Sequence, residues 1–294
     1  MNETRRHRRR KRKLRPSFVM LVAVLVALLV GLALLLTRCG KAPEPEMEET
    51  TEPVVTTEAT EPTVDPYAYA HTPLDRLVVF ARLNNLSLTE DWPEPLLELL
   101  EKNPDAEEFV RDYPFRPEEP QTIDLSDQVG TGQVPLLFQW DKRWGYSDYG
   151  GQMMALTGCG PTCMSMACLY YLEDAKYTPR YMADYAIKNG YYTKGVGTAW
   201  AFFSKGAKKL GLKIEAISPN PTTIMSHLEK GRMVVCAMGP GIFTESGHFI
   251  LLVGAKDGKA IIHDPNSKTN SEKLWNVSKF SKQISMLWVI KGKA

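Results

Sequence analysis

The sequence predicts an α+β fold, in which helices come first along the chain and an antiparallel sheet follows. Two observations carry this prediction. Apolar positions follow helical spacing up to residue 230, whereas short runs rich in Val, Ile and Leu come after residue 232. The expected helices of the main domain span residues 162–172, 178–190, 200–210 and 222–230. The expected strands span residues 134–138, 233–238, 248–253, 259–263 and 287–290.

Charge is distributed unevenly along the 294 residues. The first 41 residues hold 11 of the 36 Lys and Arg side chains and one of the 34 acidic side chains, so the rest of the chain is net acidic. A net acidic domain is atypical of nucleic-acid binding, and we expect no nucleic-acid partner. Composition divides the chain into a basic cytoplasmic arm (1–16), a transmembrane signal anchor (17–38), a stalk (39–66), a small helical segment (67–120) and a main domain (121–294).

The predicted anchor rests on an apolar run. Residues 17–37 contain no charged side chain, and 21 helical residues at about 1.5 Å each span roughly 30 Å, the thickness of a hydrocarbon core. The positive-inside rule places the basic arm in the cytoplasm and the rest of the chain outside, as on a Gram-positive cell surface. The alternatives are a cleaved signal peptide, whose apolar region is normally shorter, and a lipoprotein signal ending at Cys39, before which Arg38 is not the small residue required.

The two regions that follow have different expected roles. The stalk is rich in Pro, Glu and Thr, and it has too little apolar surface to fold by itself. In the helical segment, Leu77, Val78 and Ala81 fall on one face of a helix, and further helices begin near Pro95 and Pro104. This segment carries no chemical motif. We expect it either to pack against the main domain or to hold a partner.

The main domain is organised around the segment TGCGPTC at residues 157–163. Pro161 is expected at the first position of a buried helix, with Cys159 at the mouth of that helix. A thiol there lies near the positive end of the helix dipole, which favours the reactive thiolate. Cys163 and Cys168 fall inside the apolar run and are expected to be packing residues.

A thiolate nucleophile needs a base, and the base needs a group that orients it. His248 opens an expected core strand, and Asp264 follows the next one, so a hairpin would make them neighbours. His263 lies one residue off the face that Asp264 would share, and His227 belongs to a surface helix. The five cysteines contain no CxxC pair. A metal site of Cys159, Cys163 and His248 has weak support, and we expect neither a metal nor another cofactor.

These residues resemble cysteine peptidase family thirty-nine, the papain-like peptidases that trim bacteriocin leaders, and above all its stand-alone members. The resemblance covers residues 134–290 and rests on the motifs GCGPT, GHFI, DPN and VPLLFQWDKRW. It implies a papain-like fold with Cys159 as nucleophile, His248 as base and then acid, and Asp264 as orienting group. It further implies that Gln139 and the backbone N–H of Cys159 bind the oxyanion, with Gln152 as the competing glutamine.

The expected function is that of a membrane-anchored, extracytoplasmic cysteine peptidase that cleaves peptide or peptide-like amide bonds. Its expected partners are a peptide or protein substrate and, through residues 17–38, the membrane. The alternative is a cell-surface binding module on the same fold, without catalysis. Candidate substrate-binding residues for the enzyme are Gly158, Gly160, Trp200 and Gly247. An aromatic groove for the binding module would consist of Tyr191, Tyr192, Thr198, Ala199, Trp200 and Phe243.

Overall fold

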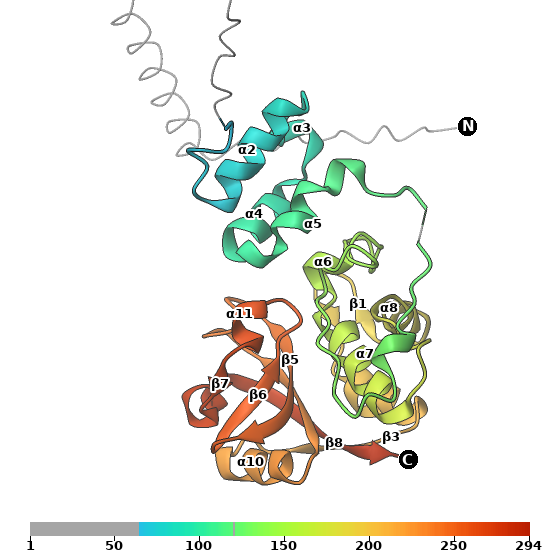
Figure 1. Cartoon of the computed structure of the whole chain (residues 1–294). Helices are drawn as coiled ribbons and strands as arrows, with labels where there is room; N and C mark the ends of the chain where they lie inside the picture. Colours follow the sequence, from blue (N-terminus) through green and yellow to red (C-terminus); the bar gives the residue numbers. More distant parts are fainter. Residues whose placement is uncertain (1–64, 120) are drawn as a thin grey trace, which may run out of the picture. The chain divides into compact units, whose positions relative to one another are not determined.

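A six-stranded antiparallel sheet forms the C-terminal part of the chain in the computed structural model, which describes residues 65–119 and 121–294 (Figure 1). Every pair of neighbouring strands is antiparallel, as the sequence predicts. The strand order is β3-β8-β4-β5-β6-β7. The strands are β3 (Leu212–Ile217), β4 (Met233–Met238), β5 (His248–Lys256), β6 (Lys259–His263), β7 (Leu274–Trp275) and β8 (Ile284–Lys293).

The sheet is buried on both faces because helices cover each side. On one face, Val235, Leu251 and Trp288 belong to a core that also contains the apolar residues of α7 (Cys159–Leu172) and α8 (Pro179–Lys188). Neighbouring residues of the same strands point to the other face, where they pack with α10 (Pro221–Glu229). The mixture of helices with an antiparallel sheet agrees with the predicted fold class.

Helix α7 is the central helix of the domain, and residues 160–169 are all buried. It begins at Cys159, directly after the short helix α6 (Met154–Thr157), whereas we expected it to begin at residue 162. Pro161 therefore occupies the third helical position instead of the first. The third position is still compatible with proline, because the first backbone N–H groups of a helix lack intrahelical acceptors. The first hydrogen bond of the α7 backbone comes one residue later, from the Thr162 N–H to the Gly158 carbonyl at 3.0 Å.

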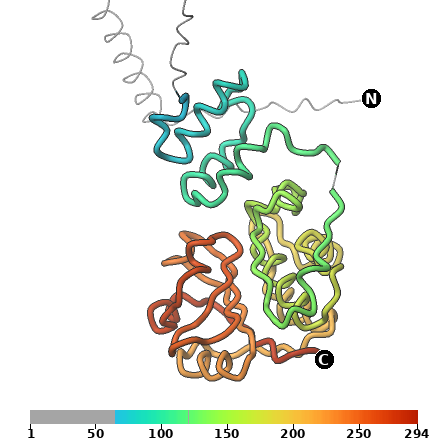
Figure 2. Tube along the Cα trace, viewed as in Figure 1, coloured from blue at the N-terminus to red at the C-terminus, as the bar shows by residue number. Residues whose placement is uncertain are grey.

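The helical segment consists of α2 (Pro73–Leu83), α3 (Leu88–Asp91), α4 (Glu94–Lys102) and α5 (Glu107–Arg111). Its core includes Leu77, Leu96 and Phe109, and Ala155 of α6 belongs to the same buried cluster. Of the two roles that the sequence leaves open, the structure shows packing against the main domain. Figure 2 traces the chain from this segment into the rest of the domain.

Some predicted elements need correction. Residues 134–138 form no strand; Leu137 is instead buried beneath α7, where its N–H contacts the sulfur of Met166 at 3.4 Å. The expected helix at 200–210 is a π-helical turn at Phe202–Gly206 followed by α9 (Ala207–Lys209). The sequence also missed β3, β7 and the small hairpin of β1 (Tyr192–Thr193) and β2 (Gly197–Thr198).

The basic arm, the anchor and nearly all of the stalk lie in residues 1–64, outside the described residues. Within residues 65–119 and 121–294, no helix combines the length and the apolar character needed to cross a membrane.

Candidate active site

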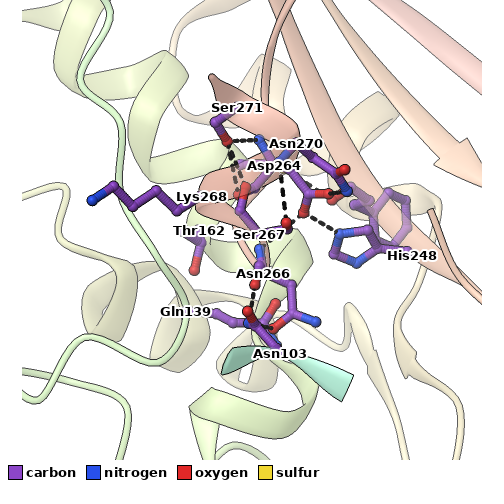
Figure 3. Close-up of polar contacts among 12 residues, drawn as sticks. Asn103, Gln139, Thr162, His248, Asp264, Asn266, Ser267, Lys268, Asn270 and Ser271 are labelled. Atoms are coloured by element: carbon purple, nitrogen blue, oxygen red, sulfur yellow. Dashed lines mark hydrogen bonds and ion pairs between the residues drawn. The ribbon is translucent and has the colours of Figure 1, made fainter. Parts of the chain in front are cut away.

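The structure brings His248 and Asp264 together through the hairpin of β5 and β6. In this hairpin Leu251 pairs with His263, so the first residue of β5 faces the chain just beyond the end of β6. Nε2 of His248 lies 2.7 Å from Oδ1 of Asp264 (Figure 3). Both side chains are enclosed, with 8% and 1% of their surface exposed. The sequence therefore identified the neighbouring pair, because both residues lie at one end of two strands that are adjacent in the sheet.

Asp264 is held by further donors that sequence reasoning missed. Its Oδ1 accepts the backbone N–H of Asn266 at 2.9 Å, and its Oδ2 accepts the side-chain amide of Asn270 at 2.8 Å. Asn270 lies on α11 (Lys268–Ser271), whose preceding residue Ser267 caps the helix. The run DPNS suggests a turn, but only the fold shows that α11 bends back to the carboxylate.

The pKa values of both His248 and Asp264 are shifted in the direction that favours their charged forms. Burial lowers the pKa of His248, but the charge of Asp264 and hydrogen bonds with Asp264 and Cys159 outweigh burial, so the pKa is raised. Burial raises the pKa of Asp264, yet the charge of His248 and hydrogen bonds from His248, Asn270 and Asn266 hold it below its ordinary value. An imidazolium beside a carboxylate is the arrangement that follows.

Cys159 is the first residue of α7 and is partly exposed, unlike the other three cysteines that the structure describes. Its thiol lies close enough to the His248 ring to be one of the groups that raise the pKa of that ring. Because Asp264 occupies Nε2 of His248, Nδ1 is the ring nitrogen left for the thiol. A thiol, an imidazole and a carboxylate in this order can generate a thiolate nucleophile.

The buried cysteines occupy packing positions. Burial raises the pKa of the Cys163, Cys168 and Cys236 thiols, which opposes ionisation. The thiol of Cys163 contacts the Phe249 carbonyl oxygen at 3.5 Å. In residues 65–119 and 121–294, no three His, Cys, Asp or Glu side chains gather as metal ligands would.

Gln139 is buried beside the site, with 4% of its surface exposed. Its Nε2 donates to the Ala155 carbonyl at 2.7 Å, and its backbone N–H donates to the Pro265 carbonyl at 2.8 Å. An amide nitrogen carries two hydrogens, so one N–H remains for another acceptor. The competing Gln152 is exposed and lines the same cavity as Gln139.

Two of the four candidate substrate-binding residues, Gly158 and Gly160, are buried. A Cβ at Gly160 would lie 2.5 Å from Oγ1 of Thr198, so this glycine permits close packing of α7 on β2. Trp200 and Gly247 are exposed and remain accessible to a ligand.

The aromatic groove expected for a binding module is not formed. Tyr191 lies in the core on one face of the sheet, with 5% exposure, whereas Phe243 packs on Trp275 and Phe280 on the other face. These rings therefore do not share a surface. His263, the other histidine near the site, directs Nδ1 to the Pro135 carbonyl oxygen at 3.1 Å.

The chain was compared with protein-family models, with curated proteins and with solved structures. Residues 131–293, more than half of the chain, match the model of the Peptidase_C39 like family. No curated protein matches the chain. The solved peptidase domain of Streptococcus ComA, a bi-functional ABC transporter involved in a quorum sensing pathway, is 17% identical, with 47% of this chain and 93% of that chain covered and a TM-score of 0.37. A putative C39-like peptidase from Bacillus anthracis is 14% identical, with 59% and 99% covered and a TM-score of 0.35.

Proposed function

Because the chain belongs to the Peptidase_C39 like family, we propose that it is a cysteine hydrolase that cleaves peptide or peptide-like amide bonds through Cys159, His248 and Asp264. The single observation that carries the proposal is the enclosed pair of His248 and Asp264, whose side chains lie 2.7 Å apart. Cys159 is among the groups that raise the pKa of the His248 ring. A carboxylate that only stabilised the fold would have no need of an imidazole that faces a half-exposed thiol.

The proposed reaction follows from these positions. His248 holds the proton of the thiol as an imidazolium, and the Cys159 thiolate attacks the carbonyl carbon to form a tetrahedral intermediate. The backbone N–H of Cys159 and the free N–H of Gln139 bind the oxyanion. His248 then donates the proton to the leaving amine, which leaves a thioester. Water, deprotonated by His248, attacks the thioester and releases the carboxylic acid and the thiol.

Covalent labelling tests the nucleophile. A thiol-reactive peptidyl probe should label the wild-type chain at Cys159, and Cys159→Ala should abolish labelling. Cys163→Ser is the matched control, since this buried thiol lies one turn further along α7, and labelling should persist. His248→Ala should slow labelling about 100-fold or more, because the base is lost. Faster modification of Cys163 than of Cys159 would overturn the assignment.

We further propose that the hydrolase is anchored in the membrane by residues 17–38 and acts outside the cell. The support is the basic arm followed by 21 uncharged residues. Protease added to intact cells should remove the domain and leave the arm protected. Recovery of a soluble protein beginning near Cys39 or Ala42 would instead show a cleaved signal.

A further inference from the structure

A cavity of about 560 Å³ lies between the helical segment and the main domain. Glu98 and Leu99 of α4 line one side of it, and Gln139 and Leu156 line the other. The motifs that contain Gln139 and Asn266 pointed to the catalytic residues and not to a cavity, and the helical segment carries no chemical motif of its own. Its wall therefore comes from two regions that the sequence treats as separate.

The cavity adjoins the candidate active site through two residues. Gln139 lines the cavity, and its amide is bonded to Ala155, four residues before Cys159. Asn266 also lines it, and the backbone N–H of this residue donates to Asp264. Figure 3 shows Gln139 and Asn266 close together near Asp264. A peptide whose scissile bond lies at Cys159 can therefore place a neighbouring residue in the cavity.

Gln139 presents an acceptor that lacks a donor. Its Oε1 is buried and has no hydrogen-bond partner in the described part of the chain. Nε2 faces the Ala155 carbonyl, so exchanging the two amide atoms would set two acceptors against each other. A buried unpaired acceptor is costly, and a ligand that donates an N–H to it recovers that cost.

The charged residues of the cavity lining favour a positively charged ligand group. Glu98 and Asp148 are exposed, and the structure shows no ion pair for either carboxylate among the described residues, whereas the ammonium of Lys102 lies 3.4 Å from Glu245. Among the apolar lining residues, Leu99 is buried and Met153 is half-buried. A lining that combines apolar side chains with exposed carboxylates suits the aliphatic stem and charged head of Lys or Arg.

We propose that this cavity is a substrate subsite that binds a basic side chain of a peptide, with Oε1 of Gln139 accepting a backbone N–H of that peptide. The inference rests on the proposed function, since it takes the bound peptide to be the substrate. It assigns to the helical segment, through Glu98, a part in specificity.

Peptide selection on an inactive chain tests the subsite without requiring turnover. The full chain carrying Cys159→Ala, in detergent, is used to select binders from a random peptide display library. Lys or Arg should be enriched at one position of the selected peptides. Adding Glu98→Gln and Asp148→Asn together should weaken binding of a selected peptide about tenfold, and adding Glu98→Lys should shift the selection toward acidic residues.

Glu101→Gln is the matched control. Glu101 is another exposed acidic residue of α4, but it does not line the cavity, so binding should change less than twofold. Replacing one peptide N–H of a selected peptide by an ester oxygen should weaken binding about tenfold at the position that pairs with Gln139. A selection without basic residues, an equal effect of Glu101→Gln, or no peptide bound would overturn the subsite.

The outcome separates the two proposals. Basic-peptide binding by the Cys159→Ala chain, without any cleavage by the wild-type chain, would retain the cavity as a binding site for a basic side chain and remove the hydrolase. Cleavage by the wild-type chain without a preference for basic residues, unchanged in Glu98→Gln, would remove the subsite alone.

Discussion

Asp264 illustrates how much one buried carboxylate can organise. It receives the His248 ring, the Asn266 N–H and the Asn270 amide, so each oxygen has a donor although the side chain is almost fully enclosed. Removing the charge alone would leave a buried imidazole without its counterion. Losing one partner of a buried pair typically destabilises a protein by about 3–5 kcal/mol.

The pH dependence of this pair has a definite sign. The folded-state pKa of His248 is raised, so the stability it contributes is complete below its ordinary pKa of 6.5 and is lost as the pH rises through the folded value. The pKa of Asp264 is lowered, so its contribution is present above 3.8 and is lost as the pH falls through the folded value. The pair therefore stabilises the fold most between these two ordinary values.

Asp264→Asn should remove this dependence. We expect the Tm of the wild-type chain to exceed that of the variant by roughly 5 °C or more at pH 6, and the gap to narrow as the pH is raised toward 10. Thermal unfolding of both proteins across that range provides the measurement. Parallel curves at all pH values would contradict the charged pair.

At the residue scale, sequence reasoning found the pair but not its supports. His248 and Asp264 could be predicted as neighbours because adjacent strands and a hairpin constrain them. Asn270 could not, since its contact depends on how α11 bends back after the turn. The buried contact of Gln139 with Ala155 depends likewise on tertiary packing, which local patterns do not encode.

Among the elements, the start of α7 depends on one close approach. The backbone of Gly160 packs against the side chain of Thr198 on β2, and Cβ, Cγ2 and Oγ1 of that threonine would all lie within 2.8 Å of an added Cβ. A side chain at position 160 would therefore clash with Thr198. To remove that clash, either the hairpin of β1 and β2 or the first turn of α7, which carries Cys159, would have to shift.

Gly160→Ala should therefore lower the free energy of unfolding by about 1–3 kcal/mol, as overpacking in a core usually does. Gly247→Ala is the control, because a Cβ there would meet no atom closer than 4.0 Å. Chemical denaturation of the two variants gives the comparison. Equal free energies of unfolding for the two variants would show that Thr198 can move away from the added methyl group without destabilising the fold.

The elements also show where periodicity is informative. The helices α8 and α10 and the strands β4, β5 and β6 have long or strongly apolar patterns and were predicted close to their observed positions. Strand β3 was missed although exposed Lys213 and Glu215 alternate with buried Leu212 and Ile214, which is the period-two pattern of a half-buried strand. The segment 134–138 has the composition of a strand, yet it pairs with no strand of the sheet.

For the whole molecule, the helical segment is tied to the loops of the candidate site. The Asn103 amide donates to the Asn266 carbonyl, and Asp105 accepts the N–H groups of Lys268 and Thr269 at 3.1 and 3.2 Å. Together with the shared core around Ala155, these contacts join the two regions. The sequence could not predict them, because each partner lies about 160 residues from the other.

The helical segment and the main domain should consequently unfold as one cooperative unit. Hydrogen exchange should give similar opening free energies for α4 and β4, and Leu96→Ala, which truncates a fully buried side chain of α4, should lower both by about 2–5 kcal/mol. Glu101→Ala, at an exposed position of α4, should leave both unchanged. Loss of protection in α4 alone would show that the segment folds independently.

The burial of three thiols has a consequence for oxidative chemistry. Peroxide attacks accessible thiolates, so Cys159 is the thiol most open to conversion into a sulfenic acid among those that the structure describes. A sulfenic acid is ordinarily protected from further oxidation when a second thiol condenses with it to form a disulfide, which can then be reduced. Cys163 is close in sequence but fully enclosed and directed at the Phe249 carbonyl. Oxidation of Cys159 would thus inactivate the site without forming a disulfide to any other cysteine of residues 65–119 and 121–294. With no resolving thiol from these residues, recovery would require an external reductant.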